Sequence, residues 1–450
     1  MRLKLDHTSS VFPTPSIPRH RVLIVSPHFP PINAPDHQRI RTALPYLREF
    51  GWEAHVLTVQ PDQVEHPKDD YLKQTLPDDL EVTATRSLPV QLTRKFGLGN
   101  LGLRSLPFLA QTGDRLLAAQ AFDLVFFSTT IFPVMVLGDR WQRRFGVPYV
   151  LDFQDPWRVD AAPTSQRPGG NLRYAIDKFL ARLLEPRAMK HVSHVVSVSP
   201  SYPTCLQKRY SWLKDEQFTV LPFGASEQDF AQLPTLGIQQ SIFDPNDGKR
   251  HWVYVGRGGS DMAFALRSLF LAIRTDRDRQ PQVWENVRLH FVGTSYASGA
   301  RATKTIEAIA QDCGIADLAT EHPHRIPYFE AQQVLQDSDA ILLIGSEDAT
   351  YTASKLYPSI LARKPILAIF HQQSSVVDIL HQCRAGQVVS FSSNDTPANL
   401  QPQLTTQLQT LLQHPKGYQP AIDWAAFQPY TAREMTRKLC KVFDHSLRES

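Results

Sequence analysis

The 450-residue sequence has only four cysteines, and they lie far apart, at Cys205, Cys313, Cys383 and Cys440. No two of them form a CxxC pair, so the sequence predicts neither a structural zinc site nor a disulfide framework, and a reducing cytosol fits best. Basic residues outnumber acidic ones by only four, 48 against 44. So small an excess argues against a dedicated nucleic-acid binder but accommodates a small acidic ligand.

Long apolar runs are also missing. Residues 1–20 hold no continuous apolar stretch, so we expect a polar, disordered leader rather than a signal peptide or an anchor. No uncharged apolar run approaches the ~20 residues that span a bilayer, and a cytoplasmic protein is therefore predicted. Residues 91–117 mix basic and apolar side chains. A helix packed on its own domain is the first interpretation, and peripheral contact with the inner face of the plasma membrane is the second.

Short apolar runs rich in β-branched residues, by contrast, are frequent, and a helical pattern follows most of them. In the first half they begin at Arg21, Ala54, Glu81, Leu124, Tyr149, His194 and Phe218, and in the second at His251, Leu289, Thr320, Ala340, Pro365 and Gln387. Runs that are apolar on both faces and alternate with helices indicate parallel strands buried between helix layers. The predicted fold class is α/β, with two Rossmann-like, doubly wound parallel-sheet domains.

A polar stretch containing Pro245 and Gly248 interrupts this pattern and indicates a linker. We therefore predict a leader at 1–20, an N-terminal domain at 21–234, a linker at 235–250, a C-terminal domain at 251–425 and a C-terminal helix within 426–450. Ligands of such sheets bind beyond the carboxyl ends of the strands. The residues that directly follow each strand are therefore the candidate site residues.

The loop after the first strand reads SPHFPPINAPDHQR and crowds His28, Asn33, His37 and Arg39 into one strand-to-helix turn. We interpret it as a ligand-facing loop, with Asn33 or Asp36 starting the helix; the alternative is a rigid turn built by its three prolines. The loop lacks a GxGxxG pattern, so nothing supports a nicotinamide or flavin dehydrogenase.

Two acids follow the fifth strand, Asp152 and Asp155, and Trp157 comes close behind them. Acids beside an aromatic ring can orient a polyol, and the ring's surroundings can tune a carboxylate pKa. The alternative is that one acid only starts the turn before Pro156.

In the second half, Arg257, Gly258 and Gly259 directly follow the first strand. Arginine offers planar, bidentate hydrogen bonds to a phosphate, and glycines let backbone N–H groups approach it closely. The alternative is an exposed turn with a solvated arginine.

A hydroxyl-rich loop, EDATYTASK, follows the strand that ends at Ser346. Lys355 lies in the first turn of the next helix, which Pro358 bends or shortens. Helices prefer acidic side chains at this end, so an anion sharing the site would explain the lysine. The interaction of one charged side chain with the helix dipole is, however, only ~0.3–1 kcal/mol. Thr352 and Ser354 can cap the helix or bind a phosphate oxygen.

These segments resemble the GT-B glycosyltransferases, specifically the family-4-like group that uses nucleotide sugars. The resemblance covers residues 21–444 and rests, in order, on SPHFPP, GWEAHVLT, FGVPYVLDFQDPW, LPFGASEQDF, YVGR, ASKLYPSILARKPILAIF and TAREMT. It implies two domains facing a cleft, with the nucleotide-sugar donor held mainly by the second domain and the acceptor by the first. It also implies that the C-terminal helix crosses back to the first domain.

The resemblance, together with the residues themselves, assigns roles to individual positions. The candidate catalytic residues are Asp155, Arg257 and Lys355. The candidate donor-binding residues are Arg257, Gly258, Ile326, Tyr328, Thr352, Ser354 and Lys355, with Arg257 and Lys355 on the diphosphate and Ile326 and Tyr328 near the nucleobase. The candidate acceptor or sugar-loop residues are His28, Asn33, Ala34 and Asp152. The resemblance implies no metal and no other cofactor.

The predicted function is therefore a hexosyltransferase-type glycosyltransferase of polysaccharide biosynthesis. It would move a sugar from a nucleotide-diphosphate sugar to a glycan or lipid-linked acceptor with retention of configuration. Many family members carry two glutamates eight residues apart where this sequence has Thr350 and Pro358. A catalytically degenerate protein that binds a nucleotide or a partner is therefore an alternative. A nucleotide-sugar epimerase is another, with only His322 and His324 as acid–base candidates in the second domain.

Overall fold

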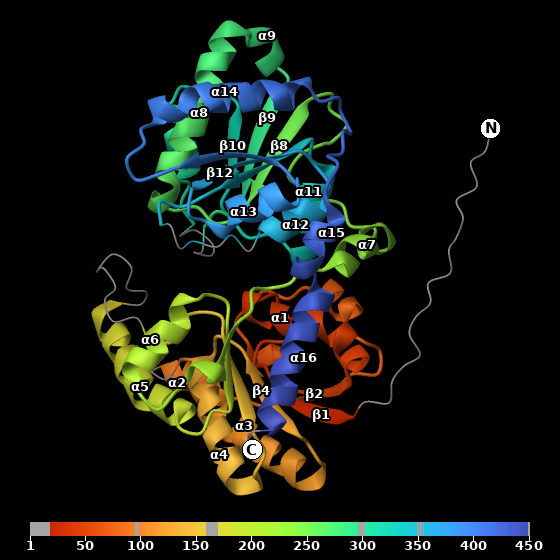
Figure 1. The fold of residues 1–450 in the computed structure, drawn as a ribbon, viewed down its shortest axis with the longest axis vertical. Coiled ribbons are helices and arrows are strands. Elements are labelled where there is room, and N and C mark those ends of the chain that lie inside the picture. The colour runs from red at the N-terminus through yellow and green to blue at the C-terminus, as the bar shows by residue number, and fades with distance from the viewer. Residues whose placement is uncertain are drawn as a thin grey trace, which may run out of the picture. The chain divides into compact units, whose positions relative to one another are not determined.

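A computed structural model describes residues 19–94, 99–158, 170–295, 302–348, 351, 353 and 355–448 (Figure 1). The chain divides into two compact units, one of residues 1–223 with 433–450 and the other of residues 224–432. No helix in the described part of the chain is long and apolar enough to cross a bilayer.

The N-terminal unit is built on one seven-stranded sheet. Its strands are β1 (His20–Val25), β2 (Trp52–Val59), β3 (Glu81–Thr85), β4 (Leu124–Ser128), β5 (Tyr149–Phe153), β6 (His194–Ser197) and β7 (Phe218–Val220). Their order is β3-β2-β1-β4-β5-β6-β7, and every neighbouring pair is parallel. All seven runs predicted in the first half of the sequence are therefore strands, and the α/β fold class is confirmed.

Helices cover both faces of this sheet. They are α1 (Gln38–Ala43), α2 (Val90–Thr93), α3 (Leu101–Ala119), α4 (Val136–Phe145), α5 (Gly170–Met189), α6 (Ser201–Arg209) and α16 (Ala432–Arg448). Alternate strand residues point to opposite faces. Leu23 and Val25 thus join the core under α3 and α4, whereas Val22 and Ile24 join the core formed with α1 and α16.

The C-terminal helix α16 belongs to this unit through its apolar face. The ring of Phe443 lies edge-on against Trp52 and Phe126, with centroids 5.2 and 5.1 Å apart. The indole N–H of Trp52 also donates to Asp444 at 2.9 Å. Packing on the strands therefore fixes the end of the chain in the first unit.

The second unit holds a six-stranded sheet. Its strands are β8 (Arg250–Val255), β9 (Val287–Val292), β10 (Ala319–His322), β11 (Ala340–Ile344), β12 (Ile366–His371) and β13 (Gln387–Phe391), in the order β10-β9-β8-β11-β12-β13. All pairs are again parallel. The six runs predicted in this half are all strands, including the run at Thr320, which forms the edge strand β10.

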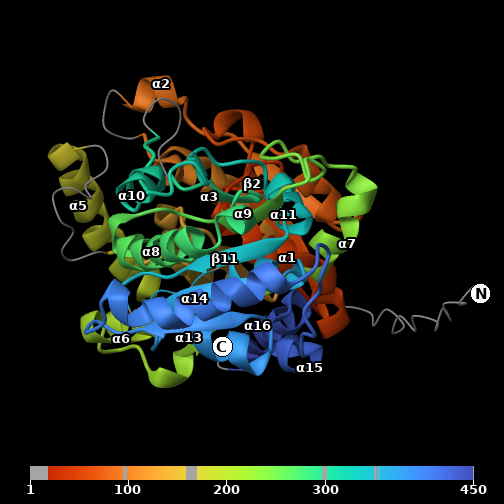
Figure 2. The same cartoon turned by 90° about the horizontal axis from the view of Figure 1, so that it is seen from above.

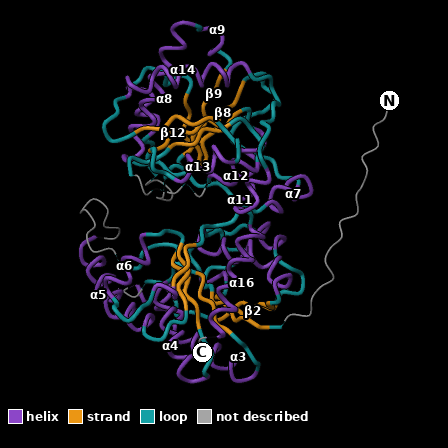
Figure 3. Tube along the Cα trace, viewed as in Figure 1, coloured by secondary structure: helices purple, strands orange, loops and turns teal. Residues whose placement is uncertain are grey.

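The helices of the second unit are α7 (Glu227–Leu236), α8 (Ala263–Arg279), α9 (Pro281–Trp284), α10 (Ile306–Asp312), α11 (Tyr328–Asp337), α12 (Leu356–Leu361), α13 (Ser375–Gln382), α14 (Pro397–Gln413) and α15 (Trp424–Phe427). α8 and α14 share one core with the sheet, whereas α11, α12 and α13 share the other. Figure 2 shows α14 lying along α8, and Figure 3 shows the strands in orange between their helices.

The strand order reverses once in each sheet, between β1 and β4 and between β8 and β11. At such a switch point the two following connections leave on opposite faces, which opens a crevice at the carboxyl ends of the strands. The loops after these four strands are therefore the places where each unit can present side chains to a ligand.

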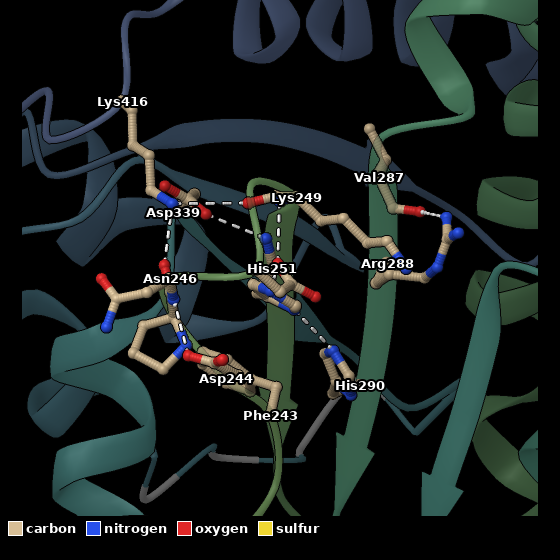
Figure 4. Close-up of polar contacts among 12 residues, drawn as sticks. Phe243, Asp244, Asn246, Lys249, His251, Val287, Arg288, His290, Asp339 and Lys416 are labelled. Carbon is tan, nitrogen blue, oxygen red and sulfur yellow. Dashed lines mark hydrogen bonds and ion pairs between the residues drawn. The ribbon is translucent and has the colours of Figure 1, made fainter.

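A polar cluster on β8 and β9 lies away from the carboxyl ends of these strands and stabilises the fold (Figure 4). The His251 ring lies 3.0 Å from His290 Nε2 on one side and 3.0 Å from Asp247 on the other, and Phe243 stacks on it at 4.3 Å. Burial lowers the pKa of His290 to about 4, with the neighbouring rings of His251 and His322 adding to the effect. The His290 imidazole is therefore a neutral packing group at neutral pH.

Candidate functional site

A buried carboxylate, Asp36, organises the loop after β1. Its Oδ1 lies 2.9 Å from His28 Nδ1, and its Oδ2 accepts from the Thr129 hydroxyl at 2.9 Å and from the Thr130 backbone N–H at 3.1 Å. Burial works to raise the pKa of Asp36, but His28 and the two threonines outweigh it and lower the pKa to about 2. The carboxylate is therefore charged at neutral pH and ties the β1 loop to the β4 loop across the switch point.

Asp36 was expected only as one of two residues that could start the helix, and that expectation is wrong. The first turn begins at Pro35 after Ala34, with no side-chain cap. Asn33 donates its backbone N–H to the carbonyl of Pro67 at 2.8 Å instead. No local signal separates an aspartate that caps its own helix from one whose partners lie on another strand.

A second buried pair, Arg39 with Asp152, lies beside the first. Arg39 Nε donates to Asp152 Oδ2 at 2.8 Å, and neither side chain is exposed. Arg39 Nη2 also donates to the carbonyl of Leu221 at 2.7 Å, and its guanidinium lies 5.0 Å from the Phe223 ring. The pair therefore joins α1, β5 and the segment after β7.

Gln154 links the two buried aspartates, through the backbone of Asp36 and the carboxylate of Asp152. Its amide N–H group donates to Asp152 Oδ2 at 2.7 Å and to the backbone carbonyl of Asp36 at 2.9 Å. The Ser128 hydroxyl also donates to Asp152 at 2.9 Å. Asp152 therefore acts on a ligand only through the groups that it holds in place, and its site role stays a prediction in this indirect form.

The remaining residues predicted in the first half differ in accessibility. His28 is buried with its ring 4.7 Å from His66, and Ala34 is buried in the core beneath the loop. Asp155, by contrast, is exposed directly beyond β5. Of the predicted acids, Asp155 is the one placed where it can meet a ligand directly.

In the second unit, Arg257 is fixed at the switch point by a bidentate ion pair. Its two terminal nitrogens donate to the two carboxylate oxygens of Asp261 at 2.9 and 2.7 Å, and its guanidinium lies 4.6 Å from the ring centre of Tyr351. The hydrogen bond from Arg257 lowers the pKa of Asp261, and a bond from Ser346 adds to this effect. The planar group is thus held in one orientation before any ligand arrives.

The loop after β11 is bound to the same carboxylate residue. The Ser346 hydroxyl donates to Asp261 Oδ2 at 2.6 Å, and the Glu347 backbone N–H donates to the Asp261 carbonyl at 2.8 Å. The Tyr351 ring in turn stacks on Phe370 with centroids 6.4 Å apart. The two loops that flank the switch point therefore form one connected structure around Arg257.

The glycines after Arg257 have different roles. A Cβ on Gly259 would lie 2.5 Å from Asp261 Oδ1 and 2.9 Å from Arg257 Nη1, so the ion pair depends on the missing side chain. The Gly258 N–H donates to the Thr294 carbonyl at 2.7 Å. That amide is therefore engaged within the protein, and the predicted donor-binding role of Gly258 remains a prediction.

Lys355 immediately precedes the short helix α12, which contains Pro358. Lys355 is an exposed residue, and its ammonium makes no hydrogen bond or ion pair with the residues that the structure describes. Burial of the ammonium nevertheless lowers its pKa, and the nearby Arg325 adds to the effect. Thr352 and Ser354, the two hydroxyl residues predicted to bind phosphate, lie outside the described residues.

Ile326 and Tyr328 lie between β10 and the start of α11. Ile326 is half-buried against the core under α11, and the Tyr328 hydroxyl donates to Asp229 Oδ2 at 2.6 Å. β9 separates β10 from β8. The structure therefore brings Arg257, Ser346 and Tyr351 together at the switch point and places Ile326 and Tyr328 beyond the edge strand.

Sequence reasoning missed Asp261, the residue that orients the arginine. It stands four residues after Arg257 in GRGGSD. The sequence alone does not distinguish an acid that pairs with the arginine from a solvent-exposed acid in a turn. Among the described residues, no group of three or more His, Cys, Asp or Glu side chains is arranged to hold a metal.

Comparisons with known proteins agree with this geometry. Residues 37–224 match the glycosyl transferase 4-like domain. The HepE protein of Anabaena, in complex with UDP and glucose, superposes with a TM-score of 0.58 at 13% identity over 94% of this chain and 99% of that one. A glycosyltransferase from Rickettsia africae gives 0.57 at 14% identity, with 96% and 99% coverage.

A UDP-forming α,α-trehalose-phosphate synthase from Burkholderia xenovorans gives a TM-score of 0.55 at 13% identity, with 95% and 99% coverage. No curated protein matches the sequence significantly. The protein has the GT-B fold, and its residues 37–224 match the glycosyl transferase 4-like domain, in agreement with the resemblance seen in the sequence.

Proposed function

We propose that the protein is a glycosyltransferase that moves a hexosyl group from a nucleotide-diphosphate sugar to a glycan or lipid-linked acceptor, with retention of configuration. The observation that carries the proposal is the fixed guanidinium of Arg257 at the switch point of the second unit. The bond that breaks joins the sugar to the diphosphate, so negative charge develops on the leaving phosphate. A donor held in place beforehand stabilises that charge without reorganisation.

The surroundings of Arg257 suit this task. Asp261 grips one edge of the guanidinium through two hydrogen bonds, and the Tyr351 ring supports its face. The ammonium of Lys355 adds a point charge at the end of the other loop of the same switch point, directly before α12.

The first unit supplies the acceptor side in this proposal. Asp155 is exposed beyond β5, and the Asp36 carboxylate, hydrogen-bonded to His28, lies buried at the neighbouring switch point. A carboxylate can accept a hydrogen bond from an acceptor hydroxyl and so orient its oxygen for transfer. HepE was solved with UDP and glucose and the Burkholderia enzyme is UDP-forming, so uridine diphosphate is the first nucleotide to test.

Calorimetric titration with UDP, GDP and ADP, followed by chromatographic detection of nucleotide released from the matching nucleotide sugars, tests the proposal. We expect one diphosphate to bind and its sugar conjugate to be turned over slowly even without acceptor. Failure of all three diphosphates to bind would contradict the proposal.

Turnover should also survive EDTA, because side-chain cations rather than a metal ion are proposed to neutralise the leaving group. Loss of turnover on chelation, with recovery on adding Mg²⁺ or Mn²⁺, would show that this part of the proposal is wrong.

A catalytically degenerate binding module is the second candidate. Pro358, inside α12, occupies a position where many family members carry a glutamate that contacts the donor. Nucleotide binding without release of nucleotide from any sugar conjugate would favour this second function over the first.

A further inference from the structure

A cavity of 220 Å³ lies within the N-terminal unit, next to the Asp36 site. Its walls come from the start of α3, the loop after β4, the segment after β5 and one side of α5. Thr130 lines the cavity and also donates its backbone N–H to Asp36 at 3.1 Å. Thr130 therefore connects the cavity wall to the hydrogen bonds around Asp36 within the same unit.

The lining is dominated by apolar groups. The rings of Phe132 and Trp157 stack with centroids 5.4 Å apart and planes inclined by 13°. Leu103 of α3 and Ala181 and Leu184 of α5 complete the apolar wall. Small-molecule sites usually combine such a surface with a few placed polar groups, whereas an unsubstituted glycan would need many hydroxyl partners.

The apolar surface continues from the cavity to the outer side of α5. Leu180 and Leu184 line the cavity, and the residues just before them, Phe179 and Leu183, are 65% and 41% exposed. Phe179 and Leu183 are four residues apart and so lie on one face of the helix. Figure 1 and Figure 2 both show α5 at the edge of this unit.

The charged side chains of the cavity are mixed in sign with a basic excess. Arg158 and Lys178 line it together with Asp177. Arg182, one turn after Lys178, is exposed beside Leu183. This combination suits a ligand with a hydrocarbon body and an anionic group next to it.

We propose that this cavity holds the hydrocarbon part of an amphiphilic, anionic acceptor whose polar end lies at the Asp36 site. The proposal rests on the glycosyltransferase function proposed above and selects a lipid-linked type of acceptor over a free glycan. Long-chain alkyl phosphates share the required chemistry, whether the chain comes from a bilayer lipid or from a soluble amphiphile.

Titration calorimetry of the full chain with decyl phosphate, kept below its critical micelle concentration, tests the cavity directly. We expect one molecule to bind per chain, and methyl phosphate to bind at least tenfold more weakly. The variant Ala181→Phe, which fills the cavity, should weaken decyl phosphate binding at least tenfold. Ala175→Phe, at an exposed position on the same helix, is the matched control and should leave the affinity unchanged within twofold.

A second variant, Leu103→Glu on α3, guards against misfolding of α5 and should weaken binding to a similar extent. UDP binding, measured on each variant, should stay unchanged, because it reports the other unit. Equal affinity of wild type and Ala181→Phe for decyl phosphate, or binding without defined stoichiometry, would overturn the cavity proposal while leaving the glycosyltransferase proposal standing. Failure of the wild type to bind any of UDP, GDP and ADP would instead refute the latter.

Co-sedimentation with vesicles of phosphatidylglycerol and phosphatidylcholine distinguishes the two possible sources of the hydrocarbon chain, a bilayer lipid and a soluble amphiphile. If a bilayer supplies it, the double variant Phe179→Ser/Leu183→Ser should reduce vesicle binding several-fold without changing decyl phosphate affinity. If the wild type binds decyl phosphate but does not co-sediment with vesicles, the acceptor is a soluble amphiphile. Either result supports the cavity assignment, provided that Ala181→Phe has weakened the binding of decyl phosphate.

Discussion

The substitution Arg257→Ala removes the side chain on which the proposed function depends. In the folded protein this guanidinium forms two hydrogen bonds to Asp261, with 23% of the arginine side chain and 40% of the aspartate side chain exposed. An ion pair this accessible to solvent contributes at most about 1 kcal/mol to folding stability. The melting temperature should therefore fall only slightly.

The effect on turnover should be far larger than the effect on stability. Removing one preorganised donor from a developing anion costs about 2.7–4 kcal/mol of transition-state stabilisation, which corresponds to a loss of about 100- to 1,000-fold in rate. The unpaired carboxylate of Asp261 would remain and repel the diphosphate. Arg257→Lys keeps the charge but lacks the planar fork, so it should recover only part of the rate.

The assay is release of nucleotide from the nucleotide sugar that the wild type turns over, measured alongside thermal unfolding. Arg267→Ala is a matched control, because Arg267 forms an Arg–Asp pair at 2.9 Å on the exposed side of α8. We expect this control to retain wild-type turnover. Turnover by Arg257→Ala within threefold of wild type would refute the phosphate-binding role, as would an equal loss in both variants.

Three further predictions concern the packing around the two switch points. Gly259→Ala should lower nucleotide affinity at nearly unchanged melting temperature, because its Cβ would enter the space of the arginine–aspartate pair; unchanged affinity in calorimetry would contradict this. Asp36→Asn should destabilise the protein by about 1–3 kcal/mol in urea unfolding, because it disrupts the buried hydrogen bonds that the Asp36 carboxylate makes to His28 and to the β4 loop. Burial lowers the pKa of His37, His194 and His290 to about 4, so the unfolded chain, with histidine pKa near 6.5, binds more protons between these values. Stability should therefore be full above pH 6.5 and fall by about 3 kcal/mol per histidine towards pH 4, and a flat melting temperature over that range would be inconsistent with neutral buried imidazoles.

The sequence by itself specified the elements of this fold. A run such as RVLIVS or AILLIG is apolar on both faces, and its shortness and β-branched residues favour a strand covered on both sides over a buried helix. This signal is local, so every predicted strand is present in the structure. Alternation with helices then restricts the sheets to parallel ones, since a parallel connection needs a crossover.

The roles of single charged residues were decided by the tertiary structure. Asp36 meets Thr129 across 93 residues of sequence, Arg39 meets Asp152 across 113, and Asp261 meets Ser346 across 85. The acids after strands look alike in the sequence, and their partners depend on which strands become neighbours. Strand order is a property of whole-chain packing, because apolar runs of equal length and composition do not encode which neighbour each will pair with. The sequence thus determined that charged side chains gather at the carboxyl ends of two sheets, and only the folded structure decided that Asp36, Asp152 and Asp261 hold other groups in place while Asp155 and Lys355 face the solvent.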